Sequence, residues 1–409
     1  MSSEIKAHGM AGELVEPDWA PLTVNELRPI LAQFPEPGEP THVLSVSPRP
    51  FSAASVVATR TDRGTGQRVF IKRHHRAVRD REGLIEEHRF LAHLREHAAL
   101  VPRVFASAAG ETAIEAGEWT YEVHEIPQGI DLYEDAISWT PFRSATHAHS
   151  AGTVLALLHR AAQGFSAPRR KPRPLVASFT VFAANDPATE MRRYLSERPA
   201  LSSHQAVQAN AEQALELLAP FHAELRPHLP ALAPLWTHND LHASNLFWSD
   251  AGPSSDENAH ATAVIDFGLA DRTNAVHDLA HAIERNMVEW LTLVNYPAHP
   301  DDVPIHLDHL DALLDGYESI CPLSSEESWA LAPMVALCHA EFALSEADYF
   351  LGALRSEEKA KMAYDGWLVG HARWFQTATG RRLLDALRRR AGSQDSPRAA
   401  HDEKKVCRP

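Results

Sequence analysis

The spacing of hydrophobic and polar residues changes along the chain and predicts two kinds of structure. Between residues 41 and 126, apolar residues form short runs or alternate with polar ones, which is typical of β-strands. We expect strands at 43–46, 56–61, 68–72, 103–108 and 119–125, with a turn at 62–66. Residues 80–97 differ, because their apolar positions recur every three or four residues, as on one face of a helix. The pattern therefore predicts an antiparallel sheet with one helix.

After residue 127 the helical spacing dominates. We expect helices at 144–162, 203–225, 276–294, 307–320, 326–351 and 358–390. Pro220 and Pro333 are expected to break or kink two of them. A hairpin of strands 246–248 and 263–265 interrupts the helices, and residues 165–199, rich in Arg, Lys and Pro, predict either a lid or substrate loop or a surface excursion.

These patterns divide the chain into four parts. Residues 1–40 are expected to be a poorly ordered lead-in with one short helix capped by Thr23, ended by the prolines of 35–40. Residues 41–126 are expected to be a strand-rich part and 127–391 a mainly helical part. The charged and polar residues 392–409 predict a disordered tail.

Composition narrows the class of protein. With 44% hydrophobic residues among 409, the chain can bury a sizeable core. A formal charge of −15 argues against a nucleic-acid or anionic-membrane partner; it would suit a cationic substrate, or it simply aids solubility. No apolar run approaches the roughly 18 residues that span a bilayer, the N-terminus does not resemble a signal peptide, and three scattered cysteines fit a reducing cytoplasm. A cytoplasmic location is expected.

The candidate chemistry lies in two short motifs. Asp240 and Asn245 are five residues apart in His-Asn-Asp-Leu-His-Ala-Ser-Asn, and Asp266 ends the apolar strand of Ile-Asp-Phe-Gly. Asp240 would orient an attacking hydroxyl, and the oxygens of Asn245 and Asp266 suit Mg²⁺. The hairpin between the motifs brings Asn245 and Asp266 to one end, as two ligands of one ion require. The motifs therefore predict phosphoryl transfer.

These motifs resemble the catalytic and metal-binding loops of the protein-kinase-like superfamily, in its aminoglycoside phosphotransferase and choline kinase branch. Asn239, where a protein kinase has Arg, and the later Asp278-Leu279-Ala280 fit that branch. The resemblance implies an α+β, bilobal protein-kinase-like fold with an N-terminal antiparallel sheet and a larger, mainly helical C-terminal lobe. It makes 41–126 the nucleotide-binding lobe and 127–391 the catalytic and substrate lobe.

The resemblance also implies the residues of the nucleotide site. Lys72 would pair with the α- and β-phosphates, and Glu87 would hold that lysine, with Glu86 as the competing candidate. Glu125 and Ile126 would mark the hinge, where adenine binds backbone groups. The loop over the phosphates would be 47–55, which contains no glycine, so Ser52 would contribute its hydroxyl and Arg49 its charge.

The sequence as a whole predicts an ATP- and Mg²⁺-dependent phosphotransferase. Its acceptor would be a hydroxyl of a small, amine-bearing molecule such as an aminoglycoside or a choline-like or homoserine-like compound. Glu284, Glu289 and Asp271 are candidates to receive the amine. Which acceptor is used stays open, because fold resemblance does not choose a substrate.

Two other classes of function stay open. The glycine-free loop 47–55 allows a catalytically inactive, kinase-like nucleotide-binding or regulatory protein. The 25 histidines include pairs four residues apart, His238 with His242 and His277 with His281, which allow a zinc or iron site. His238 is otherwise expected to steady the catalytic loop by hydrogen bonding, and Asp278 to start a helix or to brace the loop.

Overall fold

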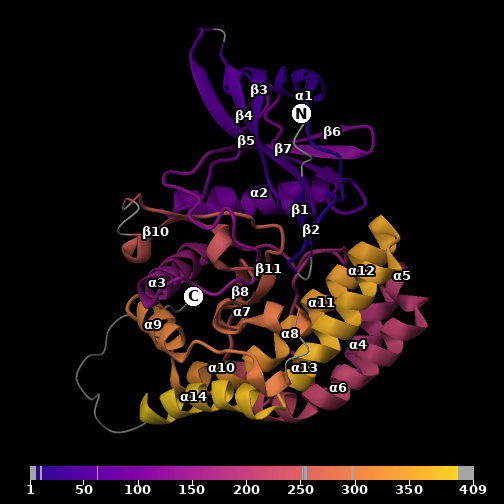
Figure 1. Ribbon diagram of the computed structural model, residues 1–409, viewed down its shortest axis with the longest axis vertical. Helices are drawn as coiled ribbons and strands as arrows, with labels where there is room; N and C mark the ends of the chain where they lie inside the picture. Colours follow the sequence, from indigo (N-terminus) through magenta and orange to yellow (C-terminus); the bar gives the residue numbers. More distant parts are fainter. Residues whose placement is uncertain are drawn as a thin grey trace. The chain divides into compact units, whose positions relative to one another are not determined.

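The computed structural model describes residues 6–9, 12–61, 63–250, 252, 256–295 and 299–394. The chain divides into two compact units, Met1–Gln128 and Gly129–Pro409 (Figure 1). The first unit contains an antiparallel sheet, and the second is mainly helical. The predicted α+β fold class, with a sheet-containing N-terminal part and a larger helical C-terminal part, is confirmed.

The elements of the first unit follow the predicted strand pattern, with additions. They are β1 (Ala7–His8), β2 (Leu14–Val15), α1 (Val24–Leu31), β3 (Glu39–Val46), β4 (Ala53–Arg60), β5 (Gly66–His75), α2 (Arg81–Glu96), β6 (Ala113–Ala116) and β7 (Trp119–Glu125). Strands β3, β4, β5, β7 and β6 lie side by side in that order, and every neighbouring pair is antiparallel.

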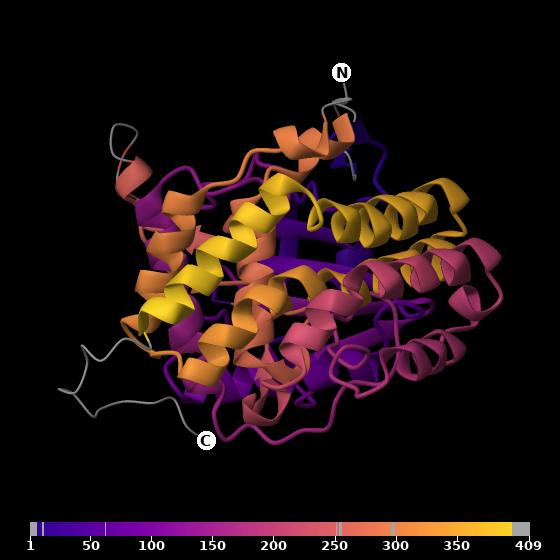
Figure 2. The same cartoon turned by 90° about the horizontal axis from the view of Figure 1, so that it is seen from below.

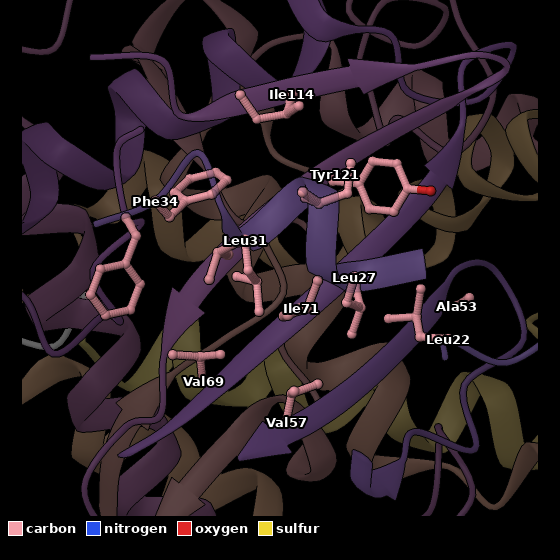
Figure 3. Close-up of a cluster of buried hydrophobic side chains, with 13 residues drawn as sticks. Leu22, Leu27, Leu31, Phe34, Ala53, Val57, Val69, Ile71, Ile114 and Tyr121 are labelled. Atoms are coloured by element: carbon pink, nitrogen blue, oxygen red, sulfur yellow. The ribbon is translucent and has the colours of Figure 1, made fainter. Parts of the chain in front are cut away.

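The two faces of this sheet are covered differently, because successive side chains of a strand point to opposite sides. Val57, Val69, Ile71 and Val123 are fully buried in one cluster with apolar residues of α1 (Figure 3). The other face carries Lys72 and Glu122, which are cross-strand partners, and contacts α2 through His88. One face is therefore an apolar core and the other is charged.

The expectation that the folded part begins at Thr41 is wrong. Helix α1 contributes Leu27, Ile30 and Leu31 to the core, and β3 begins at Glu39, inside the proline-rich segment. Glu26 of α1 also accepts hydrogen bonds from Arg73 at 2.5 Å and from Tyr121 at 2.8 Å. Helix α1 is short and contains Pro29, so its sequence alone does not show that it belongs to the core. Its packing on the sheet shows this.

A second correction concerns the strand expected at 103–108. This segment forms only an isolated bridge, from Val104 to His124, and the strand at the edge of the sheet is β6 instead. Helix α2 begins after Asp80, whose carboxylate accepts the Gly83 N–H at 2.7 Å and caps the helix. The predicted bounds of this helix are therefore within a residue of those observed.

The second unit begins with helices and a small β region. Its elements up to residue 295 are α3 (Ala145–Ala162), α4 (Pro187–Ser196), α5 (Pro199–Ser202), α6 (Gln205–Leu225), β8 (Pro234–Thr237), β9 (Leu246–Trp248), β10 (Ala261–Val264), β11 (Asp271–Asn274), α7 (Ala275–Met287) and α8 (Trp290–Asn295). Strand β8 pairs with β11, and β9 pairs with β10, both antiparallel. The predicted hairpin is confirmed.

Helices complete the second unit. They are α9 (Leu307–Glu318), α10 (Ser325–Leu337), α11 (His339–Asp348), α12 (Glu357–Lys361), α13 (His371–Trp374) and α14 (Ala378–Gln394), with π-helical turns at Tyr349–Leu354 and Met362–Gly370. Helix α10 contacts α6, α7 and α14, and Figure 2 shows α14 lying against it. Helices α3 and α9 cross closely at Gly152, where a Cβ would overlap the Leu313 carbonyl oxygen.

Several helix predictions need correction. The runs 276–294, 326–351 and 358–390 are each divided into shorter helices, whereas Pro220 and Pro333 lie inside the unbroken helices α6 and α10. Helix α14 continues to Gln394, into the predicted tail. The remainder of that tail, 395–409, lies outside the described residues, as do 1–5 of the predicted lead-in.

The segment 165–199 is not a surface excursion. Val176, Ala177, Val181 and Phe182 are almost fully buried. The N–H of Val181 also donates to the buried Glu341 carboxylate at 2.8 Å. Residues 175–182 of this segment therefore belong to the core of the second unit.

Candidate active site

The segment 238–245 is held by the strand that precedes it and by one buried carboxylate. Strand β8 ends at Thr237, and Asp278 of α7 accepts the N–H of His238 at 2.8 Å and of Asn239 at 2.7 Å. His159 Nε2 lies 3.0 Å from the same carboxylate, which helps to hold the pKa of Asp278 below its usual range despite burial. Asp278 therefore braces the loop, which is one of the two roles expected of it.

Asn239 occupies a backbone conformation that few side chains tolerate. Its φ is +61°, in the left-handed region where asparagine is favoured among residues with a side chain. Its amide oxygen accepts from Thr237 Oγ1 at 2.8 Å, and its amide nitrogen donates to the Ala177 carbonyl at 3.0 Å. This fully buried side chain fixes the turn that presents the next residue, Asp240.

Asp240 is the acidic group at the centre of this segment. Arg285 Nε lies 2.8 Å from its Oδ1, and Asn245 Nδ2 donates to its Oδ2 at 3.3 Å. Burial raises the pKa of Asp240 to about 6, against the opposing effect of the Arg285 charge. The carboxylate still has 18% of its side-chain surface exposed. It can therefore accept a proton near neutral pH from a group that reaches it.

His238 is a supporting residue, as predicted. Its Nδ1 accepts the Asp240 N–H at 3.1 Å, and its Nε2 donates to the Ile265 carbonyl at 2.9 Å. One neutral ring satisfies both bonds, since one nitrogen accepts and the other donates. The imidazole thus ties the loop to the strand that leads to Asp266.

The β9–β10 hairpin brings Asn245 and Asp266 to the same end. The Ile265 N–H donates to the Asn245 carbonyl at 2.9 Å, and Asp266 follows with φ +61°. Since Asn245 uses its amide nitrogen toward Asp240, its amide oxygen is the atom that can bind a cation. An amide oxygen and a carboxylate are the hard oxygen donors that suit Mg²⁺, so the two residues fit that ion.

The other predicted site residues lie in the first unit. Lys72 on β5 and Glu87 on α2 are both buried, with 9% and 3% of their surface exposed. Ser52 precedes β4 and is half-buried. Glu125 ends β7 with its N–H donated to the Arg103 carbonyl at 2.8 Å, and Ile126 follows it. Their roles in nucleotide binding stay predictions.

The acids considered for an amine already have partners. Asp271 is fully buried and accepts from Ser178 Oγ at 2.7 Å, Glu284 lies 2.9 Å from His371 Nδ1, and Glu289 lies 3.0 Å from His306 Nε2. Asp271 and Glu284 therefore hold the fold together, and Glu289 is only half-buried.

Two residues near Asp240 were not predicted from the sequence. Arg285 is 1% exposed and lies over the Phe342 ring at 4.1 Å. Glu346, one turn after Phe342, is also buried, and its Oε2 has no hydrogen-bond partner among the described residues. Burial raises the pKa of Glu346 to about 8. Charged residues on helices are common, so no sequence signal marks these two.

The histidine pairs do not form the metal site that was considered. His277 and His281 are buried with ring centroids 4.6 Å apart, and burial lowers the pKa of His277 to about 3. Across the described ranges, neither this pair nor His238 with His242 belongs to a group of three or more metal-ligating side chains. Phe179 packs against His277 instead.

The described part of the chain contains no helix that is both long enough and apolar enough to cross a membrane.

Comparison with known proteins identifies one family. The phosphotransferase enzyme family matches residues 49–319, more than half of the chain. A search of curated proteins finds no match.

Solved structures of low sequence identity are similar along most of the chain. An aminoglycoside phosphotransferase from Alicyclobacillus acidocaldarius has 15% identity and TM-score 0.49, with 92% of this chain and 98% of that chain covered. The amicoumacin kinase hAmiN has 13% identity and TM-score 0.49, covering 85% and 93%. A choline/ethanolamine kinase family protein from Mesorhizobium loti has 15% and 0.45, covering 88% and 95%.

Proposed function

We propose, from the premise that this chain belongs to the phosphotransferase enzyme family, that it transfers the γ-phosphoryl group of ATP to a hydroxyl of a small, amine-bearing molecule. The general activity follows from the family: the chain is a small-molecule phosphotransferase acting on hydroxyl groups. ATP, Mg²⁺ and the amine are the parts that we propose.

The observation that carries the proposal is the environment of Asp240. Its carboxylate is partly exposed, is positioned by Arg285 and Asn245, and has a pKa raised to about 6. A general base works best when its pKa lies near the working pH. Asp240 would orient the acceptor hydroxyl and take its proton as the oxygen bonds to phosphorus.

The remaining residues would position the nucleotide and its ion. Asn245 and Asp266 would hold Mg²⁺, which when bound neutralises charge on the phosphate oxygens. Lys72, supported by Glu87, would hold the α- and β-phosphates, while Ser52 and the backbone near Glu125 and Ile126 would contact the rest of ATP. The overall charge of −15 would favour a cationic acceptor.

Glu346 supports an amine on the acceptor. It is a buried acid on α11 that interacts electrostatically with both Asp240 and Arg285. A carboxyl group with a pKa of about 8 loses its proton readily when a cation approaches. An ammonium group bound near Glu346 would therefore gain an ionised partner close to the proposed base.

The experiment compares Asp240→Asn with the parent protein. Turnover is measured as ADP release over a panel of aminoglycosides, amino alcohols and sugars, and ATP binding is measured by calorimetry. We expect turnover to fall by at least about 100-fold, because general-base contributions are of that order, while ATP affinity stays within about threefold. Asp308→Asn, at a largely exposed carboxylate, is the matched control.

Unchanged turnover in Asp240→Asn would overturn the role of this residue. The alternative, an inactive nucleotide-binding protein, is supported by the glycine-free loop between β3 and β4. It predicts that the parent protein binds ATP with Mg²⁺ but releases no ADP with any acceptor or with water.

A further inference from the structure

A cluster of histidines surrounds one buried carboxylate in the first unit. Glu122 of β7 is 1% exposed, and its Oε2 lies 2.8 Å from Nε2 of both His88 and His124. One ligand atom from each of these three residues lies within 4.8 Å of the other two. Glu122 and His124 are two residues apart on a strand and so share a face, while His88 reaches them from α2.

Further groups support these three side chains from behind. His74 Nε2 lies 2.9 Å from the other carboxylate oxygen of Glu122, Oε1. Thr112 Oγ1 lies 2.8 Å from Nδ1 of His88, the nitrogen that faces away from Glu122. Outer partners of this kind fix the orientation and tautomer of metal-binding histidines and carboxylates.

We propose that His88, Glu122 and His124 bind a divalent transition-metal ion, for which Zn²⁺ is the first candidate. Two imidazoles and one carboxylate are the protein ligands of several zinc sites that leave the fourth position open, and of iron(II) sites. Mg²⁺ prefers oxygen ligands, so this nitrogen-rich site is chemically distinct from the one proposed at Asn245 and Asp266.

The hydrogen bonds of the cluster are compatible with metal entry. Without an ion, each ring donates its Nε2 proton to Glu122, and Nδ1 of His88 accepts from the Thr112 hydroxyl. With an ion, Nε2 binds the metal through its lone pair, the ring proton moves to Nδ1, and the hydroxyl accepts instead. A hydroxyl can serve in both directions, so neither state leaves His88 without a partner.

The nearest comparison within the described residues is a second group, His306, Asp308 and His309. Its three residues lie within four positions of one segment, and the Asp308 side chain is 77% exposed. His306 also contacts Glu289 at 3.0 Å. This group is much more exposed than the Glu122 cluster, which makes it a suitable internal control.

The test is metal loading of the full-length protein. The protein is stripped with a chelator, loaded with Zn²⁺ and desalted, and bound zinc is measured by elemental analysis. Loading with Co²⁺ gives an absorption spectrum that reports nitrogen ligation directly. We expect one tightly bound ion per chain in the parent protein and none in Glu122→Gln or His124→Asn.

Thr112→Val is the variant least prone to misfold. It keeps the size of the side chain and replaces only the hydroxyl with a methyl group. We expect it to weaken Zn²⁺ affinity about 10- to 100-fold, the usual effect of losing an outer partner of a ligand. The double variant His306→Asn, His309→Asn should keep both the stoichiometry and the Co²⁺ spectrum. Asp266→Asn should also keep them, which separates this site from the catalytic ion.

Three results would overturn the proposal. They are a parent protein that retains no ion after desalting, zinc lost in the His306, His309 variant but kept in Glu122→Gln, and a Thr112→Val affinity equal to that of the parent. Circular dichroism of each variant shows whether a loss of zinc reflects unfolding. Lys72, which is predicted to bind the ATP phosphates, lies directly across the β5–β7 pair from Glu122. ATP binding should therefore be measured at a constant zinc content.

Discussion

Glu122 in the first unit and Asp240 in the second are both acids largely removed from water, yet their pKa values move in opposite directions. Three histidines contact both oxygens of Glu122 and hold its pKa well below the usual range. The Arg285 guanidinium lies beside Asp240, but burial raises the pKa of Asp240 to about 6. Burial favours the neutral acid in both, so the number and placement of partners decide the outcome.

The difference separates a structural carboxylate from a reactive one. Without a metal ion, both oxygens of Glu122 accept hydrogen bonds from imidazoles. Asp240 keeps part of its surface exposed and a pKa that allows proton exchange near neutral pH. Glu346 is a third buried acid and has a still higher pKa, of about 8. Its Oε2 has no hydrogen-bond partner among the described residues.

Removing the fully partnered carboxylate should have the largest effect. Glu122→Ala, measured without metal, should lower the free energy of unfolding by about 3–5 kcal/mol, since it leaves buried imidazoles without their acceptor. Urea denaturation at pH 7 measures this, with the exposed Glu115→Ala on β6 as the control.

The pH dependence of Glu122 follows from its lowered pKa. Its contribution to stability is fully present above the usual glutamate pKa and is lost as pH falls through the lower folded value. Stability of the parent should therefore fall in acid more steeply than that of Glu122→Ala. A variant as stable as the parent would contradict the comparison.

The carboxylate that braces the catalytic loop should come next. Asp278→Asn keeps the shape but provides one amide oxygen for two backbone N–H donors, so one N–H is left unsatisfied. We expect a loss of about 1–3 kcal/mol in the free energy of unfolding and a lower kcat. Asp311→Asn, at a largely exposed position on α9, should change neither quantity.

Glu346 should behave in the opposite sense. Its folded pKa is raised to about 8, so between the usual glutamate pKa and pH 8 the folded state binds more protons, and stability falls as pH rises. Glu346→Gln removes this penalty. We expect it to be more stable than the parent by at least about 1.4 kcal/mol at pH 9, the equivalent of one pKa unit, and nearly equal at pH 5, measured by urea denaturation. The exposed Glu358→Gln should show no such difference, and a pH-independent effect of Glu346→Gln would contradict the raised pKa.

The smallest expected effect is a shift in a pH profile. As Asp240 loses its proton near pH 6, kcat/KM should rise with pH through that value. Arg285 lowers the pKa of Asp240, so Arg285→Gln should move this rise to higher pH, by about half a unit to one unit. Arg285→Lys keeps the charge and should largely restore the profile. A rise that stays at the same pH in both variants would show that Arg285 does not act on Asp240.

Much of the local structure could be predicted from the sequence, because it depends on neighbours along the chain. Alternating apolar residues marked β4, β5 and β7, and Asp80 marked the start of α2. The spacing of Asn245 and Asp266 around a turn-rich segment predicted the hairpin that brings them together. Helix ends within the long apolar region of α10 and α11 could not be predicted, because its hydrophobic residues lie on all sides.

By itself, the sequence determined the class of fold, the strands β4, β5 and β7, the start of α2, and the motif that carries the family's chemistry. Only the tertiary structure decided which buried charges meet: Arg285 with Asp240, and His74, His88 and His124 with Glu122. The physical reason is the distance along the chain over which each effect acts. Periodicity and turn preferences act between residues a few positions apart, whereas a pKa depends on every charge and on the loss of water at one point in space.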